Sequence, residues 1–299
     1  MLEIIVVGGG PAGITACIYL ARKKMNFLLL TLDVGGQTLM SAGIENYVGH
    51  QYITGPELAA KFAAHLKEFT IGLKENEEVR RVERGEGFFK VYSAGGEYRA
   101  KSVIVCTGRK PRKLSVPGEE EFYNRGITYC ATCDGPVFAG KRVAVVGGGN
   151  SGLEVALQMV RISSRVYIVE RNRQLTGDGI LIDRLKGFPN VEILTGSSIT
   201  GIRGDKFVKE ISVSGDTRGN IPVEGVLVEI GSVPNSHIAE GVEKNGSGEI
   251  IVDCGTRTSV PGLFASGDVT NVFKKQIIIA CGEGAKSAIA ASEYINSGK

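Results

Sequence analysis

The sequence predicts an α/β fold made of two similar domains, because one strand–glycine turn–helix pattern occurs twice. A β-rich run at residues 3–7 precedes a glycine turn at residues 8–13, and a helix-like segment follows at residues 14–24. The pattern recurs 139 positions later (142 − 3), with a strand at residues 142–146 and a turn at residues 147–152. A helix-like segment at residues 153–161 and a strand at residues 165–169 follow this second turn. One such turn is a weak signal, but two in the same context form a strong one.

Each turn has the spacing G-x-G-x-x-G, which suits the pyrophosphate of a dinucleotide. The glycines let the backbone approach the phosphates, and the following helix offers unpaired N–H groups and the positive end of its dipole. We therefore expect two Rossmann-like, three-layer dinucleotide-binding domains. The turn residues predicted to bind cofactor are Gly8, Gly10, Pro11, Ala12 and Gly13 in the first copy and Gly147, Gly149, Asn150, Ser151 and Gly152 in the second.

Two breaks in the chain predict that the second domain is inserted into the first. After a strand at residues 103–108 come Pro111, Pro117 and the acidic run 119–121, and a second break covers residues 233–248. The expected domains are residues 1–114 with 242–299, and residues 115–241. Two crossings between the domains allow them to rotate as bodies.

The two copies differ at the position that recognises the adenine ribose, 18 residues after the last glycine of each turn. This residue is Thr31 (13 + 18) in the first copy and Glu170 (152 + 18) in the second. Glu170 suits a free 2′-hydroxyl and would repel a 2′-phosphate by up to about 4 kcal/mol at intermediate dielectric, which favours NADH over NADPH. Arg171 and Arg173 leave NADPH open, because an arginine just beyond the strand can bind a phosphate, although both can simply face solvent.

A third glycine-bearing segment, residues 258–268, reads as a strand that ends on Asp268. Its carboxylate suits the ribityl hydroxyls of a flavin, and the alternative is an Asp that caps a turn after Gly267. Residues 282–285 then open the last predicted helix, at residues 286–296. The N-terminus of that helix would favour the electron-rich edge of a reduced flavin.

Cys130 and Cys133 form a Cys-x-x-Cys pair that ends 14 residues before the second glycine turn (147 − 133). A dithiol between a flavin turn and a nicotinamide turn indicates electron transfer by thiol–disulfide exchange, with Asp134 placed to move the proton. Half of a zinc site is the alternative, but no second Cys-x-x-Cys or Cys/His pair completes four ligands, so we predict no metal. The other cysteines read as small core residues: Cys17, Cys106, Cys254 and Cys281.

Composition gives no indication of nucleic acid or membrane binding. The 299 residues are 42% hydrophobic with a net charge of +3, and the basic cluster at residues 109–113 reads as a solvated face or a docking site for an acidic partner. The N-terminus lacks the features of a signal peptide, and no apolar run approaches the roughly 20 residues that cross a bilayer. We expect a cytoplasmic protein.

Taken in order, these motifs resemble the low-molecular-weight thioredoxin reductases over the whole chain, and still more the flavoprotein core of the bacterial alkyl hydroperoxide reductase flavoprotein, its F component. The segments that carry the family resemblance are residues 8–13, 35–37, 45–46, 130–134, 147–152 and 264–268, and those that indicate the subgroup are residues 126–130, 134–136 and 275–284. The implied fold is that of the FAD/NAD(P)-binding pyridine nucleotide-disulfide oxidoreductases of class II.

The resemblance implies FAD in the outer domain, a nicotinamide in the insert, a homodimer and a domain rotation between two states. It also implies that Cys133 faces the flavin while Cys130 attacks the disulfide of a partner, with Asp134 as the acid. Gln37, Asn46, Asp268 and Gln276 match positions that line the flavin in such proteins, and the further cofactor-binding candidates are Gly36, Thr107, Gly108, Gly231, Gly267 and Ile277.

Two departures from the family shape the predicted reaction. Residues 170–172 replace the His-Arg-Arg run of NADPH-dependent reductases, and the chain starts at the first flavin strand, without thioredoxin-like modules. We therefore expect electrons to pass from NADH through FAD and the Cys130–Cys133 disulfide to a separate thioredoxin-, glutaredoxin- or protein disulfide oxidoreductase-like protein. The alternatives are NADPH, a reduced-protein or deazaflavin donor, or a flavin redox sensor without turnover. The dithiol disfavours a ferredoxin–NAD(P) reductase.

Overall fold

The computed structural model describes residues 1–40, 44, 46–123, 125–129, 131 and 135–298 and confirms the predicted α/β class. The chain divides into two compact units, Met1–Lys110 with Val233–Lys299 (unit 1) and Pro111–Ser232 (unit 2). Both boundaries lie earlier than the expected 114/115 and 241/242. The second differs more because Ile238, Ala239 and Val242 are buried in the core of unit 1.

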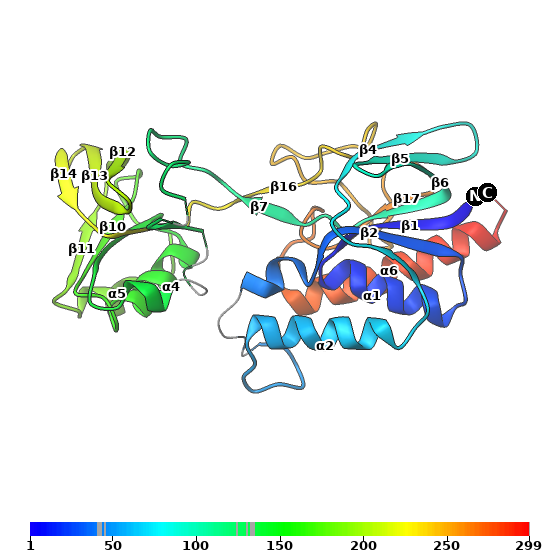
Figure 1. Ribbon diagram of the computed structural model, residues 1–299, viewed down its shortest axis with the longest axis horizontal. Coiled ribbons are helices and arrows are strands. Elements are labelled where there is room, and N and C mark those ends of the chain that lie inside the picture. Colours follow the sequence, from blue (N-terminus) through cyan, green and yellow to red (C-terminus); the bar gives the residue numbers. More distant parts are fainter. Residues whose placement is uncertain (41–43, 45, 124, 130, 132–134, 299) are drawn as a thin grey trace. The chain divides into compact units, whose positions relative to one another are not determined.

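Unit 1 is built on a seven-stranded sheet with the order β3-β2-β1-β6-β5-β4, in which β17 also pairs with β6 (Figure 1). Strands β1, β2, β3, β6 and β17 run parallel to their neighbours, whereas β4, β5 and the first half of β6 form an antiparallel meander. The strands are β1 (Leu2–Gly9), β2 (Phe27–Val34), β3 (Gly72–Lys74), β4 (Val79–Arg84), β5 (Phe89–Ser93), β6 (Gly96–Val105) and β17 (Leu263–Ala265).

Alternation along β1 sends successive side chains to two cores. Ile4 and Val6 pack with the helices, while Ile5 and Val7 pack with the meander. The helices lie on one face of the sheet (Figure 1) and are α1 (Pro11–Arg22), α2 (Gly55–Lys67), α6 (Ile277–Asn296) and the 3₁₀ helix η1 (Gly36–Met40). A Cβ on Gly284 would lie 2.0 Å from the Ala12 carbonyl oxygen, so this glycine lets α6 approach α1.

Unit 2 contains a parallel five-stranded sheet with the order β11-β10-β9-β15-β8 and a separate antiparallel sheet with the order β12-β13-β14. The strands are β8 (Ile127–Thr128), β9 (Arg142–Val146), β10 (Arg165–Val169), β11 (Val191–Leu194), β12 (Ser197–Gly204), β13 (Val208–Gly215), β14 (Gly219–Pro222) and β15 (Gly225–Val228). The helices are α4 (Asn150–Met159), α5 (Gly179–Lys186) and the 3₁₀ helix η2 (Gly135–Phe138).

The two copies of the repeat fold alike, and the structure corrects the bounds of four predicted elements. Helices α1 and α4 start three residues earlier than expected, at equivalent positions, because Gly10 and Gly149 act as their N-caps. The last helix starts at Ile277, so residues 282–285 lie inside α6, where Gly284 serves packing. Of the predicted strand at 258–268, only Leu263–Ala265 pairs with β6.

The chain passes between the units twice, at β7 (Arg109–Pro111) and β16 (Ser232–Pro234), and these two short strands pair with each other. Among the described helices, none is both long and apolar enough to cross a membrane.

Candidate functional site

The predicted flavin-binding residues of unit 1 meet at one edge of its sheet. Strands β2, β1, β6 and β17 are parallel neighbours, so their carboxyl ends lie side by side. One predicted segment follows each strand: the glycine turn after β1, Gly36 and Gln37 after β2, Thr107 and Gly108 after β6, and Gly267 and Asp268 after β17. The carboxyl edge of a parallel sheet is where such folds bind ligands.

The first glycine turn has the shape that a pyrophosphate requires. Gly8 has φ +106°, and a Cβ there would lie 2.4 Å from the Cys106 carbonyl oxygen. A Cβ on Gly13 would lie 1.8 Å from the Gly8 carbonyl oxygen, whereas one on Gly10 would meet nothing within 4 Å. No side chain caps the N-terminus of α1, so its first N–H groups are available to an anion and the turn fits a dinucleotide.

Side-chain hydrogen bonds tie the other predicted flavin segments together. Gln37 Nε2 donates to the Arg109 carbonyl oxygen at 2.6 Å, and Asn46 Nδ2 donates to Gln276 Oε1 at 2.9 Å. Thr107 Oγ1 donates to the Asn235 carbonyl oxygen at 2.8 Å, and the Asn235 amide returns a bond of 2.9 Å to the Thr107 carbonyl oxygen. Ile277 follows Gln276 as the first residue of α6.

Asp33 is a ribose candidate that the spacing argument missed. Strand β2 continues to Val34, and the expected position, Thr31, is buried with its hydroxyl donating to the Asp33 carbonyl oxygen at 2.6 Å. Asp33 is exposed and lies 20 residues after Gly13 (33 − 13), the separation typical of a ribose carboxylate. Its Oδ1 accepts the Gly36 N–H at 2.7 Å. Counting from Gly13 to the end of β2 would have identified Asp33 as the ribose candidate.

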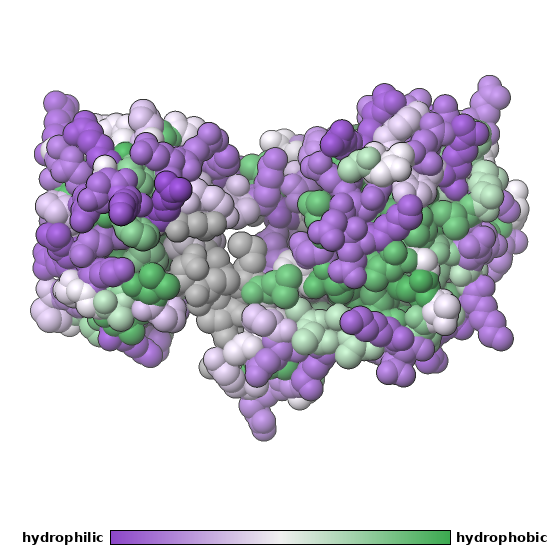
Figure 2. Space-filling model, viewed as in Figure 1, coloured by the Kyte–Doolittle hydropathy of each residue, from purple (hydrophilic) through white to green (hydrophobic). Residues whose placement is uncertain are grey.

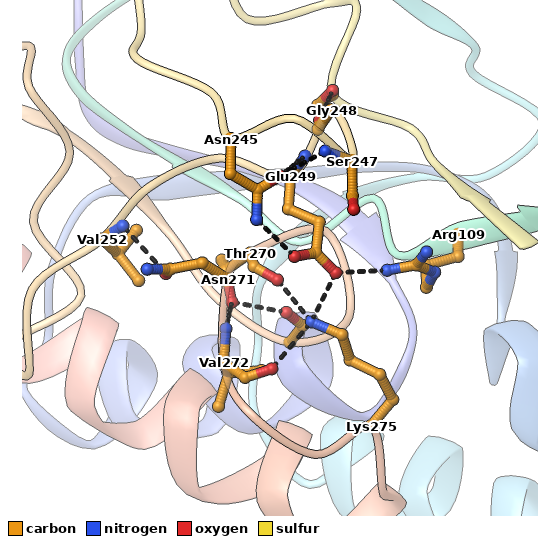
Figure 3. Close-up of polar contacts among 12 residues, drawn as sticks. Arg109, Asn245, Ser247, Gly248, Glu249, Val252, Thr270, Asn271, Val272 and Lys275 are labelled. Carbon is orange, nitrogen blue, oxygen red and sulfur yellow. Dashed lines mark hydrogen bonds and ion pairs between the residues drawn. The ribbon is translucent and has the colours of Figure 1, made fainter.

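A charged cluster of Arg109, Glu249 and Lys275, here called the Glu249 cluster, also lies in unit 1 (Figure 3). Glu249 Oε1 lies 2.6 Å from Arg109 Nη1 and 3.1 Å from Lys275 Nζ, and Asn245 Nδ2 donates to Glu249 Oε2 at 2.7 Å. Lys275 Nζ also donates to the Thr270 and Val272 carbonyl oxygens, at 2.5 and 2.9 Å. Arg109 is therefore ion-paired and mostly buried, not part of a solvated basic face as expected.

The Glu249 cluster fixes the backbone around the predicted flavin residues. Arg109 follows Gly108, and its backbone carbonyl oxygen accepts the hydrogen bond from the Gln37 side chain. The Lys275 ammonium donates to the Thr270 carbonyl oxygen and so closes the loop between Asp268 and Gln276. Burial raises the pKa of Asp268, although the nearby Lys275 and Arg109 charges act to lower it. The cluster joins residues about 140 positions apart, and no local pattern in the sequence indicates it.

The four described cysteines are free and differ in environment. Cys17 and Cys106 are core residues as predicted; burial raises the pKa of both thiols, that of Cys106 to about 12. Cys254 is exposed, so its prediction as a core residue is wrong: it lies in the turn between Asp253 and Arg257, outside any strand. Cys281 is half-buried on α6, with its Sγ 3.8 Å from the Tyr47 hydroxyl.

The second glycine turn repeats the packing of the first. A Cβ on Gly147 (φ +120°) would lie 2.3 Å from the Glu229 carbonyl oxygen, and one on Gly152 would lie 2.0 Å from the Gly147 carbonyl oxygen. Gly149 caps α4 without a side-chain hydrogen bond, so this helix also offers free N–H groups. The turn in unit 2 therefore fits a pyrophosphate equally well.

The residues predicted around the second turn lie at the same carboxyl edge. Glu170 follows β10, is buried, and accepts the Gly148 and Asn172 N–H groups, both at 2.6 Å. Arg171 is exposed beside it. The Asn150 amide bonds to Asp178, at 2.7 and 3.1 Å, and therefore shapes the loop before α5. Ser151 is exposed, and Gly231 follows β15 with φ +89°.

The predicted dithiol residues Cys130 and Cys133 and the predicted acid Asp134 lie outside the described residues. Ala131 is buried in the core of unit 2. Before the pair, the Tyr129 hydroxyl donates to buried Glu119, and burial together with this carboxylate raises the pKa of Tyr129.

The chain belongs to the pyridine nucleotide-disulphide oxidoreductase family, whose sequence profile matches residues 2–292. It is 41% identical over 307 residues to the F component of the alkyl hydroperoxide reductase of Pseudomonas putida, an alignment that covers 98% of this chain and 58% of that protein. It is 42% identical over 297 residues to a Bacillus subtilis protein named NADH dehydrogenase, again covering 98% and 58%. The chain thus spans less than three fifths of the length of these relatives.

Among solved structures, the fold is similar to the thioredoxin reductase of Lactococcus lactis. The TM-score is 0.89 at 34% sequence identity, and the match covers 99% of this chain and 100% of that one. These comparisons confirm the resemblance and the two-domain fold class that the motifs indicate.

Proposed function

We propose that this chain is an FAD-dependent disulfide reductase that passes two electrons from NADH to the Cys130–Cys133 disulfide and then to a small dithiol protein. In the net reaction, NADH and a proton become NAD⁺ while one disulfide of the partner becomes two thiols. The observation that carries the proposal is the pair of glycine turns, one in each unit, with the same packing and an open helix N-terminus.

In unit 1, the first turn would bind the FAD pyrophosphate, Asp33 the adenine ribose, and Asp268 the ribityl hydroxyls. The flavin ring would lie near the amides that the structure holds in place: Gln37, Asn46 and Gln276. When bound, FAD supplies the two-electron chemistry that connects a nicotinamide with a dithiol. In unit 2, the second turn and Glu170 would bind the nicotinamide dinucleotide.

The exchange step requires the two sulfurs of this chain, a proton from Asp134 and the partner's disulfide. The Cys130 thiolate attacks one sulfur of the partner's disulfide and forms a mixed disulfide, and the other partner sulfur leaves and takes a proton from Asp134. The Cys133 thiolate then attacks the Cys130 sulfur. The Cys130–Cys133 disulfide is restored, and the second partner sulfur leaves as a thiolate.

Anaerobic titration of the FAD-loaded protein with NADH tests this assignment. We expect the flavin absorbance to bleach and alkylation with mass spectrometry to find new thiols at Cys130 and Cys133. In Cys130→Ser the flavin should bleach without transfer to a partner. Bleaching of the unaltered protein without a thiol at Cys130 would show that the dithiol role is wrong.

Three observations bear on the donor. Glu170 and the name of the Bacillus subtilis relative favour NADH, whereas the exposed Arg171 and Arg173 favour NADPH as the second candidate. Steady-state kcat/KM for both nucleotides distinguishes them. If neither nucleotide reduces the flavin but a reduced protein or a deazaflavin does, the donor is of another class.

The acceptor is proposed from the exchange chemistry as a thioredoxin-, glutaredoxin- or protein disulfide oxidoreductase-like protein. A panel of such proteins from the same cell, each supplied oxidised with NADH, tests it. Repeated turnover with one of them would exclude a redox sensor that does not turn over, and reduction limited to one equivalent per chain would favour the sensor.

We also propose a homodimer. Apolar residues gather on the visible face of unit 1 over its helices (Figure 2), and the exposed large side chains of these helices include Tyr19, Ile278 and Ile289. Apolar surface of this kind marks interaction sites on soluble proteins. Sedimentation equilibrium should give twice the chain mass of 31.8 kDa, and a monomer at micromolar concentration would contradict it.

A further inference from the structure

Glu229 is an ionisable side chain beside the second glycine turn that the proposed reaction does not use. It follows β15, the neighbour of β9 on the side opposite β10. The strand order therefore reverses between β9 and β15, and open α/β sheets bind their ligands in the crevice at this point. The glycine turn enters the crevice from β9 and Glu229 enters it from β15.

The contacts of Glu229 place it against the phosphate-binding turn. Its N–H donates to the Val146 carbonyl oxygen at 2.8 Å, and its own carbonyl oxygen fills the space that a Gly147 side chain would need. The Glu229 Cβ lies 3.6 Å from the position of a Cβ on Gly152, in the first turn of α4. The carboxyl group therefore starts beside the helix N-terminus that would bind a pyrophosphate.

The equivalent position in unit 1 carries a thiol. The Cys106 carbonyl oxygen fills the space at Gly8, and its Cβ lies 3.4 Å from a Cβ on Gly13. Cys106 is buried and hydrogen-bonded to Ser266, so it is neutral near pH 7. Only in unit 2 does this position bring an acid to the phosphate site.

Burial and the Glu154 carboxylate on α4 raise the pKa of Glu229 from 4.5 to about 7. The other described ionisable groups on the flanking strands β8, β9 and β10 or just after them are Tyr129, Arg142, Arg165, Tyr167, Glu170, Arg171 and Arg173. Cys130, Cys133 and Asp134 lie outside the described residues. A bound pyrophosphate adds negative charge beside Glu229, and nearby like charge favours the neutral acid.

We propose that the nicotinamide dinucleotide binds to the form of unit 2 in which Glu229 is protonated, so that binding takes up a proton. The inference rests on the proposed nicotinamide function of unit 2. It adds a residue that sets the affinity of that site and makes this affinity depend on pH in the neutral range.

Isothermal titration of the FAD-loaded protein with NAD⁺, and in parallel with NADP⁺, tests the inference without turnover. Experiments at pH 6, 7 and 8 in two buffers of different ionisation enthalpy give the dissociation constant and the protons taken up. With a pKa of about 7 and binding only to the protonated form, Kd should rise about tenfold from pH 6 to pH 8, and proton uptake should rise from about 0.1 to about 0.9 per nucleotide.

Three variants separate Glu229 from the other groups. Glu229→Gln should bind with a Kd that varies little from pH 6 to 8 and without the uptake, and Glu154→Gln should shift the change in Kd to lower pH. Glu224→Gln, at the opposite end of β15 with its carboxylate paired to Arg142, should behave like the unaltered protein.

The same pH dependence in Glu229→Gln and the unaltered protein would overturn the inference. Loss of binding in Glu229→Gln at every pH would also overturn it, since the site would then need the carboxylate. Binding to the unaltered protein without proton uptake overturns this inference alone. Failure of both nucleotides to bind at any pH overturns the nicotinamide assignment and the inference together.

Discussion

Glu249→Gln tests whether the Glu249 cluster stabilises unit 1. The substitution keeps the size of the side chain and removes the only carboxylate that pairs with both Arg109 and Lys275 in the described part of the chain. The side chains of Glu249, Arg109 and Lys275 are 15%, 14% and 24% exposed, so both cations would be left poorly solvated beside a neutral amide.

The expected loss follows from the two contacts. At an effective dielectric constant of about 20, separations of 2.6 and 3.1 Å correspond to about 6 and about 5 kcal/mol of gross attraction. Most of this is offset by the cost of removing three charges from water, and removing one partner of a buried pair typically destabilises by about 3–5 kcal/mol. Because the cluster keeps some contact with solvent, we expect about 3 kcal/mol.

Urea unfolding at pH 7 and fixed FAD concentration measures the loss. Far-UV circular dichroism is the suitable signal because the chain has no tryptophan, and hydrogen exchange over residues 245–252 shows where protection is lost. The matched control is Glu78→Gln, which removes an ion pair to Arg80 whose side chains are 58% and 69% exposed. The control should cost about 0.5 kcal/mol or less. An equal effect of the two substitutions would refute the argument.

The pH dependence gives a second check on Glu249. Burial alone would raise its pKa, but hydrogen bonds from Asn245, Arg109 and Lys275 together hold it below the usual 4.5. A carboxyl group with a lowered folded-state pKa stabilises the fold above its unfolded pKa and loses this effect as the pH falls through the folded value. The difference between the unaltered protein and Glu249→Gln should therefore be constant from pH 7 to 5 and decrease in more acidic solution.

Three further predictions concern unit 2. Gly152→Ala places a Cβ 2.0 Å from the Gly147 carbonyl oxygen, so it should lower the free energy of unfolding by about 3 kcal/mol and abolish nucleotide binding. In the control Gly179→Ala the new Cβ has nothing within 4 Å, and calorimetry should show no change in stability or in nucleotide binding. Glu170→Ala should raise kcat/KM for NADPH relative to NADH at least tenfold by removing the carboxylate that repels the 2′-phosphate, and a fall in NADPH use would contradict this. Glu229 has a raised folded-state pKa, so its stabilising neutral form is lost as the pH rises from 4.5 through about 7. At pH 8, Glu229→Gln should therefore unfold at a higher urea concentration than the unaltered protein. Its free energy of unfolding should be larger by at most about 3 kcal/mol, and by less where solvent screens the charge. At pH 4.5 the two proteins should unfold at the same urea concentration.

The parts of the fold that follow from local pattern were predictable. Strands 142–146 and 165–169 match β9 and β10 residue for residue, because alternating β-branched side chains and the adjacent glycine turn fix both ends. The expected helix starts are three residues late in both copies. The glycines at positions 10 and 149 are N-caps, so the second half of each glycine turn already belongs to the helix.

What the sequence did not indicate depends on residues distant in the chain. Glu249 meets Arg109 across 140 positions, so Arg109 reads as one more charge in a basic surface run. Asp33 was missed because the predicted strand ends at Thr31, whereas β2 continues for three more residues, to Val34. The carboxylate near the end of the strand therefore lies two positions after Thr31. Gly282 and Gly284 read as a helix start because close helix packing, which Gly284 serves, has no local signature.

The two glycine turns place different chemistry at one equivalent position. In both turns a carbonyl oxygen, that of Cys106 or of Glu229, lies 2.3 to 2.4 Å from where a Cβ on the first glycine would be. The backbone at Cys106 and Glu229 is therefore constrained in the same way, whereas the identity of their side chains is not. In the proposed function, a neutral thiol beside the first turn would add no pH dependence near neutrality to the binding of FAD, which would suit a cofactor that stays bound. Burial and Glu154 raise the pKa of Glu229 beside the second turn to about 7, so its ionisation would weaken phosphate binding there, which would suit a nicotinamide dinucleotide that leaves after each turnover of the proposed reaction.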